Sequence, residues 1–273
     1  MTDQYAVFGN PIAHSRSPQI HALFAAQTRQ DIVYKKQQVE LDKFKETTRD
    51  FFAQGCGLNI TVPFKLEAFA FADALSERAQ RAGAVNTLKK MPDGKIFGDN
   101  TDGAGLLHDI TLNLGWKITG KRVLILGAGG AVRGILAPLL AENPAKLVVS
   151  NRTTSKAQTL LEAFSCPEKL SICEWGALNQ TEINESFDIV INGTAASLQG
   201  EMPALNPAIF AKNACAYDLM FNGKLPFLMW AKQHGAQVAD GLGMLVEQAA
   251  ESFYLWRGVR PETLAVIQTL REM

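Results

Sequence analysis

Two segments of the sequence carry side chains that could pass a proton to a substrate oxygen. Lys65 ends the segment NITVPFK (59–65), in which Pro63 stops a predicted strand. Asp102 lies in GDNTDG (98–103), whose Asp, Asn, Thr and Gly are typical of a loop. Because α/β folds bind ligands at the carboxyl ends of parallel strands, we predict that Asp102 pairs with Lys65 and keeps a proton within reach of a substrate oxygen. An ordinary surface ion pair is the alternative interpretation.

Two serines precede the first predicted helix. Ser15 and Ser17 lie in GNPIAHSRSP, and Pro18 suits the first helical position, so Ser17 is expected to be the N-cap. Two hydroxyls at the N-terminus of a helix suit a carboxylate. The alternative is an N-cap serine beside a loop serine, with no ligand.

A glycine-rich turn follows a buried strand predicted over 123–126. In LGAGGAVRG, Gly127 and Gly129 fit the Gly-x-Gly-x-x-Gly pattern, whereas the third place holds Val132. A helix is predicted over 131–141, so backbone N–H groups could approach a pyrophosphate at its N-terminus. A tight strand-to-helix turn without a ligand would also need glycine.

The next predicted strand ends without an acidic residue. An NAD-binding unit usually places Asp or Glu there to bind the ribose 2′-hydroxyl. This chain instead has Asn151, Arg152 and Lys156 in VVSNRTTSK, and a guanidinium can bind a 2′-phosphate in a fork. The pattern favours NADP over NAD, and a solvated basic loop is the alternative.

The elements that must position these residues form an α/β pattern. Strands and helices alternate over the first hundred residues, and a second series of βαβ units from about residue 120 indicates a doubly wound nucleotide-binding domain. A late helix is predicted to start after Gly243 and to run to about Trp256, and a terminal helix is predicted after Pro261. A chain of 273 residues is long enough for two domains.

Composition excludes several classes of protein. With 27 basic and 27 acidic residues, the formal net charge is zero, so no overall field favours nucleic acid or a membrane surface. We expect no transmembrane helix and no signal peptide. The four cysteines are scattered, which is typical of a reduced, cytoplasmic protein, and the four dispersed histidines predict no metal site.

Taken together, these segments resemble the shikimate dehydrogenases, which use NADP to reduce 3-dehydroshikimate reversibly to shikimate in aromatic amino-acid biosynthesis. The resemblance covers nearly the whole chain, through YAVFGNPIAHSRSP, NITVPFK, AGAVNT, GDNTDG, GAGGA, NRT and DGLGMLVEQAA. It implies that Lys65 and Asp102 are the catalytic pair. It further implies an N-terminal α/β substrate domain (1–102 with 243–273), a Rossmann-type NADP-binding domain (103–242), and C-terminal helices that return to the first domain.

The resemblance also implies the residues that bind substrate and cofactor. The serines would hold the substrate carboxylate, and amide and hydroxyl side chains would meet the ring hydroxyls; the implied substrate-binding residues are Ser15, Ser17, Asn59, Thr61, Asn86 and Gln248. The implied NADP-binding residues are Gly127, Ala128, Gly129, Gly130, Ala131, Asn151, Arg152, Thr153, Lys156, Thr194 and Gly241. We expect a monomer or a homodimer that binds shikimate and 3-dehydroshikimate.

Two departures from the family keep other functions open. Ala195, in NGTAAS, stands where the family often has serine, and Phe221, in YDLMF, where it often has a tyrosine near the substrate. A quinate/shikimate dehydrogenase, or a related enzyme with another hydroxy-acid substrate, is therefore an alternative. A non-catalytic NADP-binding regulator is a second one, although the presence of both Lys65 and Asp102 disfavours it.

Phe221→Tyr tests the second departure. The substitution is nearly isosteric and adds one hydrogen-bond donor, which is worth roughly 0.5–3 kcal/mol depending on the charge of its partner. KM for shikimate should therefore fall by a few-fold to about a hundredfold with little change in kcat. Steady-state kinetics with shikimate and quinate provides the test. An unchanged or raised KM for shikimate would refute the missing-hydroxyl hypothesis, and a gain for quinate alone would favour the alternative substrate.

Overall fold

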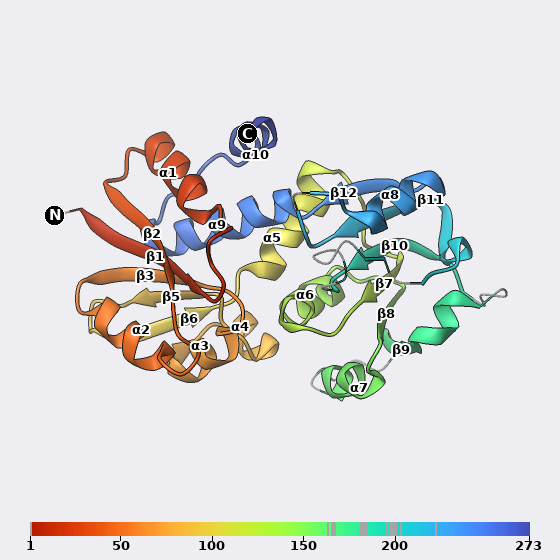
Figure 1. The fold of residues 1–273 in the computed structure, drawn as a ribbon, viewed down its shortest axis with the longest axis horizontal. Helices are drawn as coiled ribbons and strands as arrows, with labels where there is room; N and C mark the ends of the chain where they lie inside the picture. The colour runs from red at the N-terminus through yellow and green to blue at the C-terminus, as the bar shows by residue number, and fades with distance from the viewer. Residues whose placement is uncertain are drawn as a thin grey trace. The chain divides into compact units, whose positions relative to one another are not determined.

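The protein is an α/β chain of two compact units, seen in a computed structural model (Figure 1). The first unit comprises Met1–Gly105 and Leu245–Met273, and the second comprises Leu106–Met244. The C-terminal helices therefore belong with the N-terminal segment, as predicted. The structure describes residues 2–162, 164, 168–180, 185–194, 196, 201–202, 204–221 and 223–273.

The first unit is built on a six-stranded sheet in the order β2-β1-β3-β5-β6-β4. Its strands are β1 (Asp3–Gly9), β2 (Ile32–Gln38), β3 (Gly55–Ile60), β4 (Ala74–Leu75), β5 (Thr87–Lys90) and β6 (Ile96–Asp99). Its helices are α1 (Ser17–Thr28), α2 (Phe44–Phe52), α3 (Lys65–Phe71), α4 (Glu77–Ala82) and α10 (Leu264–Glu272), with the start of α5 (Asp102–His108) and most of α9 (Leu242–Arg257). β5 and β6 pair antiparallel and form a hairpin.

Alternation along β3 decides which side chains face the candidate site. Successive side chains of a strand point to opposite faces. Leu58 and Ile60 are buried in an apolar core with side chains of α2 and α3. Asn59, between them, points to the other face and contacts Ser252 of α9.

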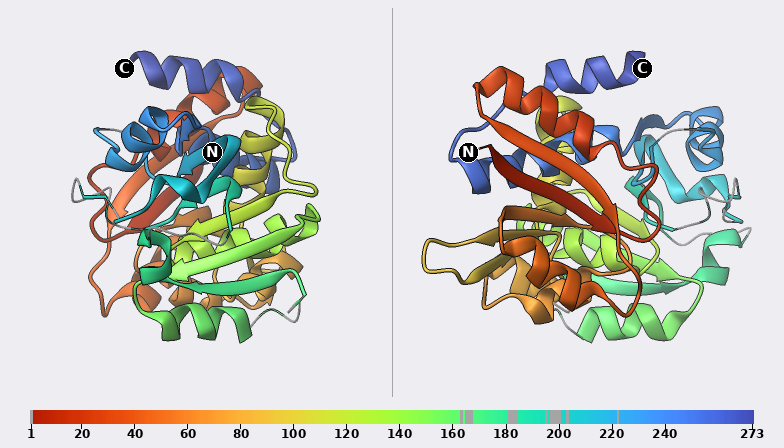
Figure 2. Two further views of the ribbon diagram at one scale, coloured as in Figure 1. Left: turned by 90° about the vertical axis from the view of Figure 1, so that its right-hand side faces the viewer. Right: turned by 60° about the vertical axis from the view of Figure 1, so that its left-hand side comes forward.

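The C-terminal helix of the first unit lies near α1, as the views of Figure 2 show. The Arg16 guanidinium donates to the carbonyl of Leu270 in α10, and the amide of Glu262 donates to the side chain of Gln27 in α1. These contacts tie the chain end to the segment that carries Ser15 and Ser17.

The second unit has a six-stranded parallel sheet in the order β12-β11-β10-β7-β8-β9. This is the doubly wound arrangement of nucleotide-binding domains. Its strands are β7 (Arg122–Leu126), β8 (Lys146–Asn151), β9 (Leu170–Glu174), β10 (Phe187–Asn192), β11 (Phe210–Asp218) and β12 (Gln237–Asp240). Its helices include α6 (Gly130–Ala141), α7 (Thr154–Glu162), α8 (Pro226–Gln233) and a π-helical turn, Asp109–Asn113.

Apolar layers cover both faces of this second sheet. Val123 and Ile125 of β7 pack in a core with residues of α6 and α7. Leu124 and Leu126, which alternate with them, pack in another core with residues of α8. A strand buried on both faces needs a continuous apolar sequence, which is the pattern that predicted β7.

Two local predictions were wrong. Ser17 is not the N-cap of α1, because it already belongs to the helix and Arg16 occupies the cap position. Asp102 is not a loop residue but the first residue of α5. Helix α2 begins at Phe44, after a turn in which the Lys43 amide donates to the Glu40 carbonyl.

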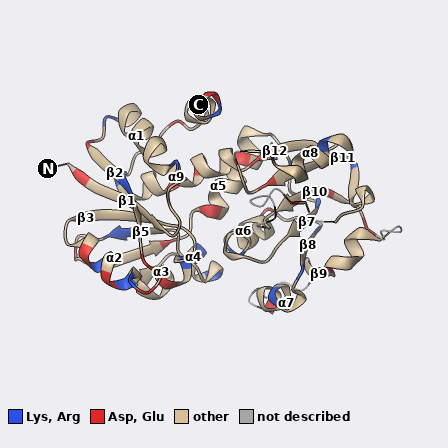
Figure 3. Cartoon of the chain, viewed as in Figure 1, with Lys and Arg blue, Asp and Glu red and all other residues tan. Residues whose placement is uncertain are grey.

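Charged side chains of both signs alternate over the surface helices, as Figure 3 shows for α2, α3 and α4. Lys43 pairs with Glu46, and Arg81 with Glu77, one helical turn apart. In the part of the chain that the structure describes, no helix has both the length and the apolar character needed to cross a membrane.

Candidate active site

Lys65 and Asp102 form an ion pair that is largely withdrawn from solvent. Lys65 is the first residue of α3 and Asp102 the first residue of α5. The Lys65 Nζ atom lies 2.5 Å from Asp102 Oδ2, and their side chains are 16% and 8% exposed. A charge-assisted hydrogen bond between shielded groups is stronger than an exposed surface pair.

Asn86 fixes the second oxygen of the Asp102 carboxylate. Its Nδ2 atom donates to Asp102 Oδ1 at 2.8 Å and to Thr101 Oγ1 at 2.9 Å. Its Oδ1 atom accepts from the Thr101 amide at 2.9 Å. Because Lys65 holds one carboxylate oxygen and Asn86 the other, the Asp102 side chain has a single orientation.

Asn86 is connected to two other predicted residues, to Asn59 through buried hydroxyl groups and to Gln248 directly. Asn59 Nδ2 donates to Thr87 Oγ1 at 3.1 Å and to Ser252 Oγ at 3.0 Å, and the two hydroxyl oxygens lie 2.7 Å apart. Gln248 Oε1 lies 3.4 Å from Asn86 Nδ2, at the long end of the hydrogen-bond range. The structure therefore brings Lys65, Asp102, Asn86, Asn59 and Gln248 into one network.

Sequence reasoning missed three hydroxyl residues of this network, which are Thr87, Thr101 and Ser252. All three are fully buried. Ser252 lies four residues after Gln248, so helical periodicity could have placed both on one face of α9. Thr101 could have been found beside Asp102 in GDNTDG.

The serines and Thr61 lie at the ends of other elements. The Ser15 hydroxyl accepts from the Ser17 amide at 3.3 Å, so Ser15 rather than Ser17 satisfies a free N–H group at the start of α1. Ser17 is buried and Ser15 half-buried. Thr61 follows β3, and its methyl group lies against Gly9, where an added Cβ would approach it to 2.5 Å.

The glycine turn of the second unit leaves open space above the N-terminus of α6. Gly127 has φ of +108°, and a Cβ there would lie 2.9 Å from the Gly193 carbonyl oxygen. Gly129 is the N-cap of α6, and a Cβ at Gly129 or Gly130 would meet nothing within 4 Å. This turn fits a bound pyrophosphate, because the first N–H groups of α6 are accessible.

The end of β8 presents positive charge. Asn151 donates to the Thr153 carbonyl at 2.8 Å, and Arg152 and Lys156 are exposed. Within the described residues, neither Arg152 nor Lys156 forms an ion pair. Both cations therefore fit an anionic ligand such as a 2′-phosphate.

Two further predicted cofactor residues lie after β10 and β12. The hydroxyl of Thr194 donates to Asn192 Oδ1 at 2.8 Å, and Asn192 in turn donates to the buried Asp218 at 2.8 Å. Gly241 lies so close to Leu219 that a Cβ would meet its carbonyl oxygen at 2.3 Å. Ala195 lies outside the described residues, and Phe221 is half-buried.

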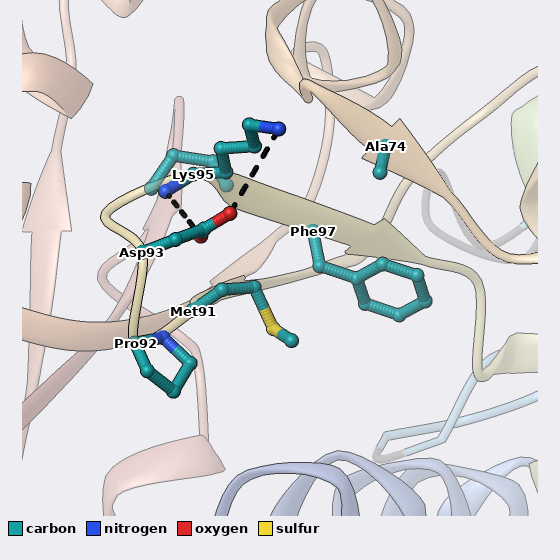
Figure 4. A pocket seen from close by; sticks show the side chains of 7 residues that line it. Ala74, Met91, Pro92, Asp93, Lys95 and Phe97 are labelled. Atoms are coloured by element: carbon teal, nitrogen blue, oxygen red, sulfur yellow. Dashed lines mark hydrogen bonds and ion pairs between the residues drawn. The ribbon is translucent and has the colours of Figure 1, made fainter.

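A separate cavity of about 400 Å³ lies on the β5–β6 hairpin (Figure 4). Asp93 and Lys95, joined by a hydrogen bond and an ion pair, lie at the hairpin turn. Its lining residues are Ala74, Met91, Pro92, Asp93, Lys95, Ile96 and Phe97. None of them belongs to the network around Asp102, so we assign this cavity no part in the candidate active site.

Comparisons with known proteins agree on one family. Residues 7–88 match the shikimate dehydrogenase substrate binding domain, residues 110–200 match shikimate / quinate 5-dehydrogenase, and residues 241–271 match the shikimate 5'-dehydrogenase C-terminal domain. A curated relative named shikimate dehydrogenase (NADP(+)), from Janthinobacterium sp. (strain Marseille), is 57% identical over 99% of this chain and 98% of its own length. The chain belongs to the shikimate dehydrogenase family.

Solved structures of similar length have the same fold. An Ael1 enzyme from Pseudomonas putida superposes with a TM-score of 0.91 at 48% identity, covering 98% of each chain. Shikimate 5-dehydrogenase from Thermus thermophilus, solved in complex with NADP(H) and shikimate, has a TM-score of 0.87 at 31% identity and covers 99% of each chain.

The glycine turn yields a stability prediction that needs no ligand. Gly127→Ala should lower the free energy of unfolding by about 1–3 kcal/mol, because its φ is unfavourable for alanine and the methyl group would press on Gly193. Gly130→Ala is the matched control and should change it by less than about 1 kcal/mol, since its Cβ meets open space. Urea denaturation measures both. Equal losses in the two variants would contradict this account of the turn.

Proposed function

We propose that this protein is an NADP-dependent shikimate dehydrogenase, which reduces 3-dehydroshikimate reversibly to shikimate. The single observation that carries the proposal is the shielded Lys65–Asp102 ion pair, whose carboxylate Asn86 also holds. Full-length relatives that bear this name, at more than half identity, support the same reaction. Reduction of the ketone to an alcohol requires a proton for its oxygen, and the Lys65 ammonium can donate one.

NADPH, when bound, supplies the hydride that adds to the ketone carbon of 3-dehydroshikimate. As that bond forms, negative charge develops on the ketone oxygen. The Lys65 ammonium is proposed to stabilise this charge and to give the oxygen its proton. Asp102 holds the ammonium in place, and in the oxidation of shikimate the same pair takes the hydroxyl proton back.

The remaining predicted residues are proposed to bind and orient the reactants. Ser15 and Ser17 would hold the carboxylate of shikimate, and Asn59, Thr61, Asn86 and Gln248 its ring hydroxyls. The first unit would thus be the substrate domain and the second the NADP domain. The N–H groups at the start of α6 would bind the pyrophosphate, and Thr194 and Gly241 would support the cofactor after β10 and β12.

We also propose that the protein is cytoplasmic. The free thiols of Cys56, Cys173 and Cys215 support a reducing compartment. Its oligomeric state, monomer or homodimer, stays a prediction that light scattering on the purified protein can measure.

Lys65→Ala tests the catalytic proposal. Loss of a positioned proton donor should lower kcat for shikimate oxidation by about 10²–10⁴-fold and leave the affinity for NADPH nearly unchanged. Steady-state kinetics and a fluorescence titration with NADPH measure the two effects. Lys95→Ala is a matched control, because it removes a lysine that pairs with Asp93 at the surface of the same unit. A folded Lys65→Ala protein with near-normal turnover would refute the assignment.

Arg152→Ala tests the choice of cofactor. Removing its hydrogen bond to the 2′-phosphate should weaken NADP binding by about 1.5–3 kcal/mol and NAD binding much less. Arg122→Ala, which removes an arginine from the amino end of the neighbouring strand β7, should change neither. The test is to measure the dissociation constants of NADP and NAD for the wild type and both variants. If Arg152→Ala weakens NADP and NAD equally, Arg152 does not bind the 2′-phosphate.

A further inference from the structure

Tyr34 of β2 contributes a hydroxyl to the network, although no motif pointed to it. Its Oη atom donates to Asn59 Oδ1 at 2.7 Å. Burial raises the pKa of the Tyr34 hydroxyl well above its ordinary value, and the neighbouring Ser17 side chain opposes that rise. Tyr34 therefore lies beside Asn59 of β3 and Ser17 of α1, which are both proposed to bind shikimate.

The orientation of the Asn59 amide is fixed by its neighbours. Its Nδ2 atom faces the Asn86 carbonyl oxygen at 3.3 Å, which can only accept, so the amide nitrogen and not the oxygen must lie on that side. The hydroxyls of Thr87 and Ser252 also accept from Nδ2. Both N–H bonds of Asn59 are thus used within the protein.

The amide oxygen of Asn59 is the atom left for a substrate. A carbonyl oxygen can accept two hydrogen bonds, and Tyr34 makes one of them. The remaining position can receive a hydrogen-bond donor but not a carboxylate. Asn59 should therefore bind a ring hydroxyl of shikimate, and the Tyr34 hydroxyl determines the direction from which that hydroxyl can approach.

Aromatic packing holds the ring of Tyr34 in place. The ring of His21 stacks on it, with centroids 4.1 Å apart and planes 9° apart. His21 is fully buried, and burial lowers its pKa to about 3, so the stack is uncharged at neutral pH. Trp256 contacts the same ring at a centroid distance of 6.3 Å.

We propose that Tyr34 is a positioning residue for substrate binding, which orients the Asn59 amide oxygen toward shikimate. The inference rests on the proposed function, because it assigns the substrate of that same site. It adds a residue that acts through its neighbours and makes no contact with the reacting atoms.

Tyr34→Phe tests the proposal, and Tyr5→Phe is its matched control. Tyr5 is the partner of Tyr34 in the register of β1 and β2, and its ring also contacts Trp256, but its hydroxyl accepts from Arg257 instead of meeting Asn59. Tyr34→Phe should raise KM for shikimate roughly 5–50-fold, with kcat within about threefold and KM for NADP unchanged. Tyr5→Phe should match the wild type in all three values, and thermal unfolding checks that both variants fold.

Shikimate analogues that each lack a different ring hydroxyl separate positioning from a general structural effect. Calorimetric titration should show that Tyr34→Phe weakens shikimate but not the one analogue that lacks the hydroxyl bound by Asn59. A KM for shikimate within twofold of wild type, an equal rise in KM for NADP, or equal weakening of every analogue would overturn the inference. Failure of the wild-type protein to oxidise shikimate would instead refute the proposed function, and the inference would fall with it.

Discussion

The buried ion pair between Lys65 and Asp102 is the constraint that the first unit must satisfy. Withdrawing two charges from water costs several kcal/mol per ion unless their remaining polar atoms find partners. Asp102 meets this condition, because its carboxylate accepts from Lys65 and Asn86 and its amide donates to Asn100 at 3.2 Å. Removing any one of these partners would leave a charge or a donor unpaired in a poorly hydrated place.

That constraint extends through the unit as a continuous chain of hydrogen bonds. From Asp102 the chain of hydrogen bonds passes to Asn86, the residue before β5, and then through Thr87 and Ser252 to Asn59. It ends at Tyr34 on the edge strand β2. In the second unit, open space surrounds Gly129 and Gly130, and the exposed Arg152 and Lys156 form no ion pair among the residues that the structure describes. Both features suit an anionic ligand such as a phosphate ester.

Much of the fold could be read from local sequence, but the network could not. The apolar run of β7 and the glycines after it identify a nucleotide-binding domain because both signals lie within a dozen residues. Ser252 is 193 residues from Asn59, and Tyr34 is 25 residues from it, so only strand register and the return of α9 reveal these contacts. The N-cap prediction at Ser17 failed for a related reason, since the helix also includes Ser17 and the Ser15 hydroxyl supplies the acceptor.

The most direct test of this account is the steady-state oxidation of shikimate by the wild-type protein, with NADP and with NAD, followed by the absorbance of the reduced cofactor. The account predicts turnover of shikimate, with a higher kcat/KM for NADP than for NAD. Reduction of neither cofactor, or a preference for NAD, would contradict it.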